Sequence, residues 1–137
     1  MRHPISHLVT QADLELRAEG AAHLAVAKAQ LAGNHASDSS DASGALDAAF
    51  EDFQEVQNRN AENWHRGPGV DVEVVADDLA ETFYLKGRVA ETAANVNASR
   101  SDLGRADDFY RRAAEQLTPK QSDYQQALLA FRLRTPQ

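Results

Sequence analysis

The sequence predicts an all-α protein, and three observations support this prediction. Apolar side chains recur three and four residues apart over most of the chain, as they do on one face of a helix. The four prolines and seven glycines fall mostly between these periodic segments. Much of the 42% apolar content is alanine, which suits close helix–helix contacts. A chain of 137 residues is expected to form a single helical domain with a modest core.

The first helix is predicted over residues 7–32, where leucines and alanines recur at helical spacing. Residues 1–6 are expected to be a flexible lead-in, because Pro4 opposes a helix there and Ser6 suits an N-cap. Gly20 interrupts the apolar pattern at a cost of about 1 kcal/mol relative to alanine. A glycine in such a place is usually tolerated for close packing.

A second helix is predicted over residues 44–65, with Leu46, Phe50 and Phe53 near one face. Before it, residues 33–43 are rich in serine and aspartate and are expected to form a solvated loop. After it, the Gly-Pro-Gly sequence at 67–69 ends the helix.

The third helix is predicted from Asp71 to Ala98, although its beginning is ambiguous. Valines alternate over residues 70–75, as in a strand, whereas Val75 and Phe83 belong to a series with helical steps of four. No second strand is predicted as a pairing partner. We therefore expect a helix, with an extended entry as the alternative.

Two shorter helices complete the chain. One is predicted over residues 103–117 and the other from Thr118 to Leu133, with Thr118 as N-cap and Pro119 at the first helical position. The last helix is expected to be a capping helix with a polar outer face, followed by a tail at 134–137. Short connections predict two antiparallel hairpins and this cap.

The segment 79–119 resembles a helical hairpin of the tetratricopeptide repeat. Phe83 and Gly87 match its first helix, and Ala106, Tyr110 and Ala113, followed by a proline, match its second. The resemblance implies that small residues on one helix accept a bulky residue from the neighbouring helix, and that the array binds other proteins. The spacing between the two helices exceeds that of the repeat. The alternative is an irregular bundle that uses the same packing residues.

The net charge of −7 is unevenly distributed along the chain. Residues 1–98 hold 16 acidic and 7 basic residues, whereas residues 99–137 hold 5 acidic and 7 basic residues. The acidic part would repel phosphates, so we expect no direct binding to nucleic acid or to an anionic membrane. The same asymmetry permits head-to-tail self-association between acidic and basic ends.

Several classes of function lack support in the sequence. Cysteine is absent, which excludes disulfides and thiolate metal sites. Neither a signal-peptide core nor a run of ~18 apolar residues is found, so we expect an intracellular or virion-associated protein without membrane attachment. No phosphate loop or nucleophile motif occurs either. We therefore expect a non-enzymatic protein with no cofactor and no bound metal.

The favoured function is a helical protein–protein interaction or assembly module, which binds another protein or further copies of itself. Trp64 is a candidate anchor, because tryptophan is enriched at interface hot spots; the alternative is that it seals the end of the bundle. Phe83 and Tyr84 are further candidates, with Arg111 and Arg112 as rim charges. Aspartates three or four residues away are expected to pair with these arginines.

The first alternative is a phage-type component, either a virion structural subunit or an acidic inhibitor that mimics nucleic acid. Mimicry requires negative charge in a continuous line along one surface. The acids expected to form that stripe are Asp71, Glu73, Asp77, Asp78 and Glu81.

The second alternative is a carboxylate and histidine metalloprotein centred on Glu62 and His65. A Glu-x-x-His sequence places both side chains on one helix face, as in di-metal carboxylate proteins. Further ligands would have to come from other helices, where Glu19, His23 and Glu91 are candidates. The helix dipole explains a histidine at a helix end equally well.

Overall fold

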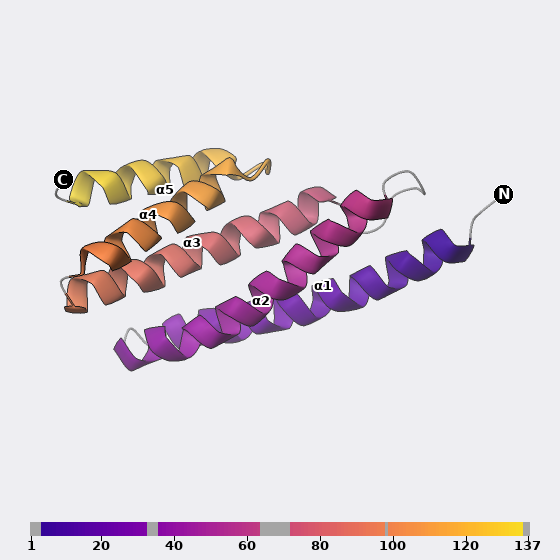
Figure 1. Ribbon diagram of the computed structural model, residues 1–137, viewed down its shortest axis with the longest axis horizontal. Coiled ribbons are helices and arrows are strands. Elements are labelled where there is room, and N and C mark those ends of the chain that lie inside the picture. The colour runs from indigo at the N-terminus through magenta and orange to yellow at the C-terminus, as the bar shows by residue number, and fades with distance from the viewer. Residues whose placement is uncertain (1–3, 33–35, 64–71, 98, 136–137) are drawn as a thin grey trace.

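The computed structural model confirms the all-α fold. It describes residues 4–32, 36–63, 72–97 and 99–135, which contain helices and no strand. No helix in these ranges is both long enough and apolar enough to cross a membrane. The elements are α1 (Pro4–Leu31), α2 (Ala36–Asn63), α3 (Val72–Asn97), α4 (Arg100–Glu115) and α5 (Gln121–Arg134) (Figure 1).

Each helix packs against the next one in the chain. The α1–α2 hairpin lies on one side of the molecule, α3 lies in the middle, and α4 and α5 lie on the other side (Figure 1). One group of buried side chains joins α1, α2 and α3, and its largest fully buried members include Leu46, Phe53 and Leu79. A second group joins α3, α4 and α5 around Tyr110 and Phe131. The hairpins are thus fused into one core through α3.

A glycine facing an aromatic ring sets the distance between the helices in each hairpin. A Cβ atom added to Gly20 of α1 would lie 2.8 Å from Cε1 of Phe53 on α2. A Cβ atom added to Gly87 of α3 would lie 2.9 Å from Cδ1 of Tyr110 on α4. Both distances are shorter than any normal carbon–carbon contact, so only glycine fits. The prediction that small residues accept bulky neighbours is confirmed at both positions.

Two predicted irregular segments in the first half of the chain are helical instead. Helix α1 begins at Pro4, so the predicted lead-in is wrong over residues 4–6 and Ser6 is not the N-cap; residues 1–3 lie outside the described residues. Proline is favoured at the first position of a helix, where its missing N–H is not needed. Helix α2 begins at Ala36, so most of the predicted 33–43 loop is helical. Ala42 in this segment is fully buried, and the aspartates suit a helix N-terminus.

The boundaries of the later helices also differ from the prediction. From Val72 onward the chain is helical, which excludes the extended alternative for 72–75; residues 70 and 71 lie outside the described residues. Helix α4 begins at Arg100, because the Ser99 hydroxyl accepts a hydrogen bond from the Asp102 N–H at 3.2 Å. Thr118 is not the N-cap of α5. Its hydroxyl accepts a hydrogen bond from the Lys120 N–H at 3.1 Å within the turn before the helix.

The outer face of α5 contradicts the expectation of a polar cap. Phe131 is buried against α3 and α4, but Leu129 and Leu133 are 58% and 88% exposed. With 3.6 residues per turn, these two leucines lie on the side of the helix opposite Phe131. Helix α5 therefore has an apolar face on each side.

We predict that Gly87→Ala destabilises the protein by about 1–3 kcal/mol, although alanine is the better helix former by about 1 kcal/mol. The Tyr110 ring is 1% exposed and has no room to retreat from the new methyl group. Urea unfolding followed by circular dichroism measures the change. Gly44→Ala is the matched control, since nothing lies within 4 Å of its added Cβ, and it should stabilise α2. Equal stability of the two variants would show that the close approach is not a constraint.

Candidate functional site

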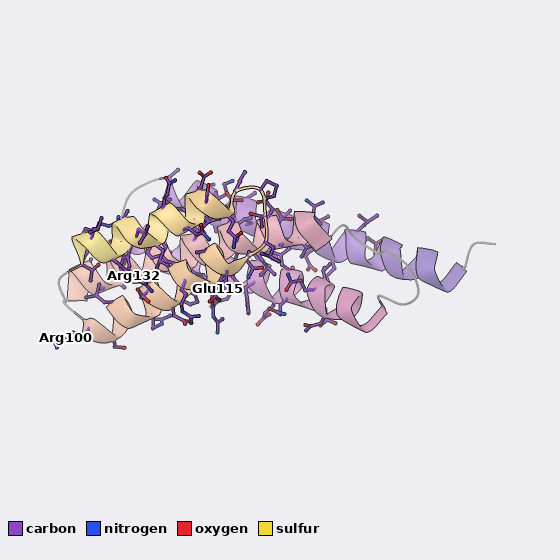
Figure 2. All side chains as sticks on the ribbon, turned by 90° about the horizontal axis from the view of Figure 1, so that it is seen from above. Arg100, Glu115 and Arg132 are labelled. Atoms are coloured by element: carbon purple, nitrogen blue, oxygen red, sulfur yellow. The ribbon has the colours of Figure 1, made fainter. Side chains whose placement is uncertain are left out.

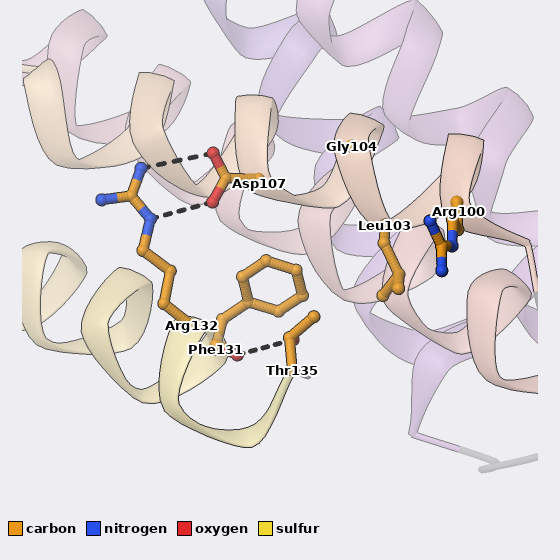
Figure 3. Close-up of a pocket in the computed structure, with 7 residues that line it drawn as sticks. All are labelled: Arg100, Leu103, Gly104, Asp107, Phe131, Arg132 and Thr135. Carbon is orange, nitrogen blue, oxygen red and sulfur yellow. Dashed lines mark hydrogen bonds and ion pairs between the residues drawn. The ribbon is translucent and has the colours of Figure 1, made fainter. Parts of the chain in front are cut away.

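One candidate site lies at the end of the molecule where α4 begins and α5 ends. An open hollow of about 800 Å³ is present there. Figure 3 shows the Phe131 ring and the Leu103 side chain at its floor, with Arg100 at one side and Arg132 at the other. Gly104 adds no side chain, which keeps the hollow open. Its lining thus combines an apolar floor with cationic edges.

Exposed apolar side chains continue beyond this hollow. Leu133 follows Arg132 on the outer side of α5, and Leu129 lies one turn before it. Val96, in the last turn of α3, is 66% exposed, and α3 ends on the side of the molecule where α4 begins (Figure 1). We call Leu129 and Leu133 the outer leucines. Two neighbouring, largely exposed leucines on one helix face are a feature of a surface that contacts another molecule.

Charged hydrogen bonds fix α5 in place at this end. Arg132 donates to the two carboxylate oxygens of Asp107 on α4, at 2.9 and 3.3 Å (Figure 3). Arg134 donates to both oxygens of Glu91 on α3, at 2.7 and 2.8 Å. The Tyr110 hydroxyl donates to Glu91 Oε1 at 2.8 Å. Helix α5 is therefore held by its polar contacts and by Phe131, without help from the outer leucines.

The Arg134–Glu91–Tyr110 network shifts the acid–base properties of its members. Hydrogen bonds from Arg134 and, to a smaller extent, from Tyr110 lower the pKa of Glu91. Burial, with the hydrogen bond to Glu91, raises the pKa of Tyr110. The carboxylate is thus ionised and the phenol neutral at neutral pH.

An arginine without an acidic partner among the described residues lies at the end that carries the hollow, where the neighbouring Arg132 and Arg134 are paired. Arg100 is exposed at the extreme end of the molecule, whereas Glu115 lies nearer its middle (Figure 2). Within the described residues, Arg100 has no acidic partner, and it lies at the N-terminus of α4, where the helix dipole is also positive. This arrangement costs free energy in the isolated chain and favours an acidic neighbour.

The structure separates the aromatic residues predicted to bind a partner. Phe83 is 5% exposed and belongs to the core, so it does not present its ring to a partner. Tyr84 is half-buried between Tyr110 and Tyr124, with ring centroids 5.8 Å away in both cases. It lines a second open hollow, of about 430 Å³, between α1, α3 and α5. Trp64 lies outside the described residues.

The arginines predicted as rim charges are exposed but already paired. Arg111 forms ion pairs with Asp108 and with Glu115, the latter at 3.0 Å, both on its own helix. Arg112 pairs with Asp108 at 3.3 Å, and its guanidinium lies 5.6 Å from the centre of the Phe83 ring. The predicted pairing within the helix is confirmed, and these side chains hold α4 and cover the core.

The acidic stripe required for nucleic-acid mimicry is not a free surface where the structure describes it. Asp78 pairs with Arg17 at 3.1 Å, and Glu81 pairs with Lys28 at 3.0 Å. Both bases belong to α1, so these acids join α3 to α1. The side chains of Asp71 and Glu73 lie outside the described residues.

The Glu62 and His65 side chains, the centre of the metalloprotein alternative, are outside the described residues as well. The group of possible metal ligands that the described residues bring together is Glu19, His23 and Asp52. Glu91, another predicted candidate, is instead bound to Arg134 and Tyr110.

Sequence reasoning did not identify the outer leucines as functional candidates. The signal was present in the last helix, where Leu128, Leu129, Phe131 and Leu133 are too many apolar residues for one face. The expectation that a capping helix has a polar outer face hid this excess of apolar residues.

Comparison of the chain with protein-family models, with curated proteins and with solved structures found no match in any of the three.

We predict that Glu91→Gln destabilises the protein by about 1.5–3 kcal/mol at pH 7, because two charged hydrogen bonds to Arg134 are weakened. The pKa of Glu91 is lowered in the folded state, so its stabilising contribution is complete above the unfolded value of 4.5. It is lost as the pH falls through the lower, folded-state pKa.

Unfolding free energies between pH 3 and pH 7 test this prediction. The difference between the two proteins should shrink as the pH falls below 4.5, the ordinary glutamate pKa. Burial raises the pKa values of Asp52 and Asp78, so these groups change stability with pH in the opposite direction to Glu91. Their contributions are the same in both proteins and cancel in the difference. A difference independent of pH would contradict the role of the ionised carboxylate.

Proposed function

We propose that this protein is a helical assembly module that binds through the α4–α5 end, with a second copy of the chain as its partner. The observation that carries the proposal is the pair of outer leucines on the side of α5 opposite Phe131. Burying each of them in an interface would contribute about 1.5–3 kcal/mol. The hollow beside them would receive a side chain of the partner.

Charge complementarity favours a second copy as the partner. The segment 99–137, which forms α4 and α5, has a net charge of +2, and the segment 1–98 has a net charge of −9. An exposed carboxylate such as Glu51 on α2 would face Arg100 of the next molecule. Such pairing increases the association rate and selects the orientation, while the leucines supply most of the affinity.

Contact between two different surfaces of the same chain is a heterologous interface. Repetition of such an interface gives a closed ring or an open filament, depending on the rotation between neighbours. The proposed function therefore predicts assemblies larger than a dimer at high concentration. Paired tetratricopeptide-like hairpins are one known architecture for such binding surfaces, which is consistent with the resemblance of residues 79–119.

Multi-angle light scattering on chromatographed protein tests the proposal. At about 50 mM salt, where charges act over more than 10 Å, the mass should rise with protein concentration. The double variant Leu129→Gln, Leu133→Gln should weaken association at least tenfold, since about 1.4 kcal/mol corresponds to a factor of ten. Salt at about 500 mM should also weaken it.

Leu117→Gln is the matched control. Leu117 is 80% exposed but lies in the turn at the opposite end of α5, so its loss should leave association unchanged. Circular dichroism should show equal helix content in every variant, because all three leucines are on the surface. A monomer at every concentration up to about 1 mM, a value typical of weak affinities, would overturn the proposal.

A further inference from the structure

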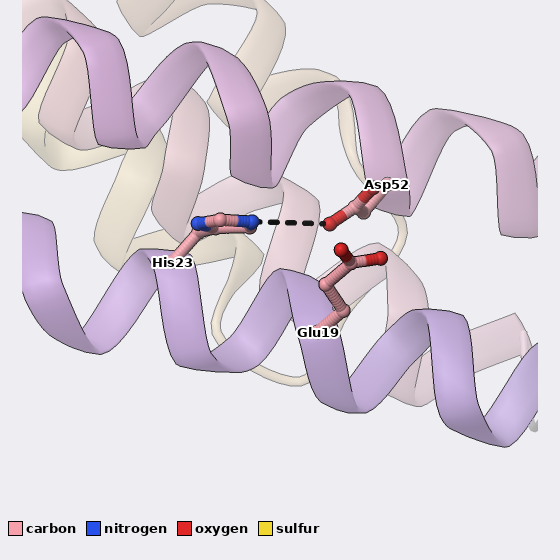
Figure 4. Close-up of side chains that lie close together, drawn as sticks. All are labelled: Glu19, His23 and Asp52. Carbon is pink, nitrogen blue, oxygen red and sulfur yellow. Dashed lines mark ion pairs between the residues drawn. The ribbon is translucent and has the colours of Figure 1, made fainter.

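We propose that Glu19, His23 and Asp52 form a binding site for one divalent transition-metal ion between α1 and α2. Glu19 and His23 lie four residues apart on α1, and Asp52 faces them from α2 (Figure 4). One ligand atom from each residue lies within 4.8 Å of the others. The site does not depend on the self-association proposed above.

The backbone places these side chains by the same close approach that forms the hairpin. Gly20 follows Glu19, and a Cβ atom on Gly20 would lie 3.1 Å from the Cβ of Asp52. Without a side chain at position 20, α2 comes near enough for Asp52 to reach the space between residues 19 and 23. A larger residue at position 20 would separate the ligands.

The distances fit a shared ion better than a direct contact. His23 Nε2 and Asp52 Oδ2 are 3.8 Å apart, which is too long for a hydrogen bond. Ligand bonds of about 2.0–2.2 Å around a tetrahedral zinc ion place neighbouring ligand atoms about 3.4 Å apart. A small rotation of each side chain brings the three atoms to that separation.

The Asp52 carboxylate has a buried oxygen that receives no hydrogen bond from the described residues. Its Oδ2 atom has almost no solvent-accessible surface and accepts no hydrogen bond within the described part of the chain. Burial and the neighbouring carboxylate of Glu19 both raise the pKa of Asp52. Two carboxylates held this close are stabilised by a cation between them.

The ligand set indicates the class of metal. One imidazole nitrogen and two carboxylate oxygens, with no thiolate, suit zinc and the other divalent ions of the late first transition series. Calcium and magnesium prefer ligand sets made of oxygen alone. The His23 side chain is 39% exposed, and three protein ligands leave a fourth position for water or another ligand.

Calorimetric titration of zinc chloride into chelator-treated protein tests the site. It is done at low protein concentration, so that self-association does not contribute. We expect one zinc ion per chain and a rise in melting temperature with zinc, because the ion binds the folded hairpin only. His23→Gln and Asp52→Asn should each weaken zinc binding by at least about tenfold. In the absence of metal, the melting temperature of Asp52→Asn should be no lower than that of the original protein, because the substitution removes a negative charge that is partly buried and lies near Glu19.

His65→Gln is the matched control, because it removes the histidine of the Glu62–His65 motif and leaves the proposed ligands unchanged. Zinc binding should persist in this variant. Absence of saturable binding up to about 1 mM zinc, a value that corresponds to only about 4 kcal/mol, would overturn the proposal. Binding that survives both His23→Gln and Asp52→Asn, or that is lost in His65→Gln, would overturn it as well.

Discussion

The rest of the structure depends on the close approach of the two helices in each hairpin. In each hairpin, a glycine of one helix faces an aromatic ring of the other. Gly20 receives Phe53 and Gly87 receives Tyr110, once in each hairpin. Both rings are almost fully buried, and each belongs to one of the two groups of core side chains. A chain so rich in alanine has few bulky side chains with which to fill space, so its helices must come close together to exclude water.

Both candidate sites follow from these two contacts. In the first hairpin, the contact between Gly20 and Phe53 brings Asp52 of α2 close to Glu19 and His23 of α1. In the second hairpin, the Tyr110 hydroxyl donates a hydrogen bond to Glu91. Glu91 also accepts a hydrogen bond from Arg134 at the end of α5. The position of α5, and with it the orientation of the outer leucines, thus depends on a ring that only a glycine can accommodate.

Sequence patterns predicted the helices and the role of small residues such as Gly87, because these follow from periodicity and side-chain size. The patterns failed for residues 36–43, where serine and aspartate suggested a loop. This segment is helical, and Ala42 within it is buried. Phe83 could not be told from a surface aromatic, since burial depends on which helix lies opposite. The sequence showed Glu19 and His23 of the metal-ligand group as a pair four residues apart. Asp52 lies 29 residues after His23, and only the fold brings it to them.

The way in which α5 is attached explains why its outer face is available. A terminal helix held only by apolar contacts would have to bury most of its leucines to remain docked. Here Arg132 and Arg134 each make two charged hydrogen bonds to another helix, and Phe131 supplies the buried apolar contact between them. Such bidentate pairs define orientation as well as contribute energy. The attachment of α5 is therefore complete within the chain, and the exposure of Leu129 and Leu133 contributes nothing to it. The two outer leucines therefore stay exposed at no cost to the attachment of α5.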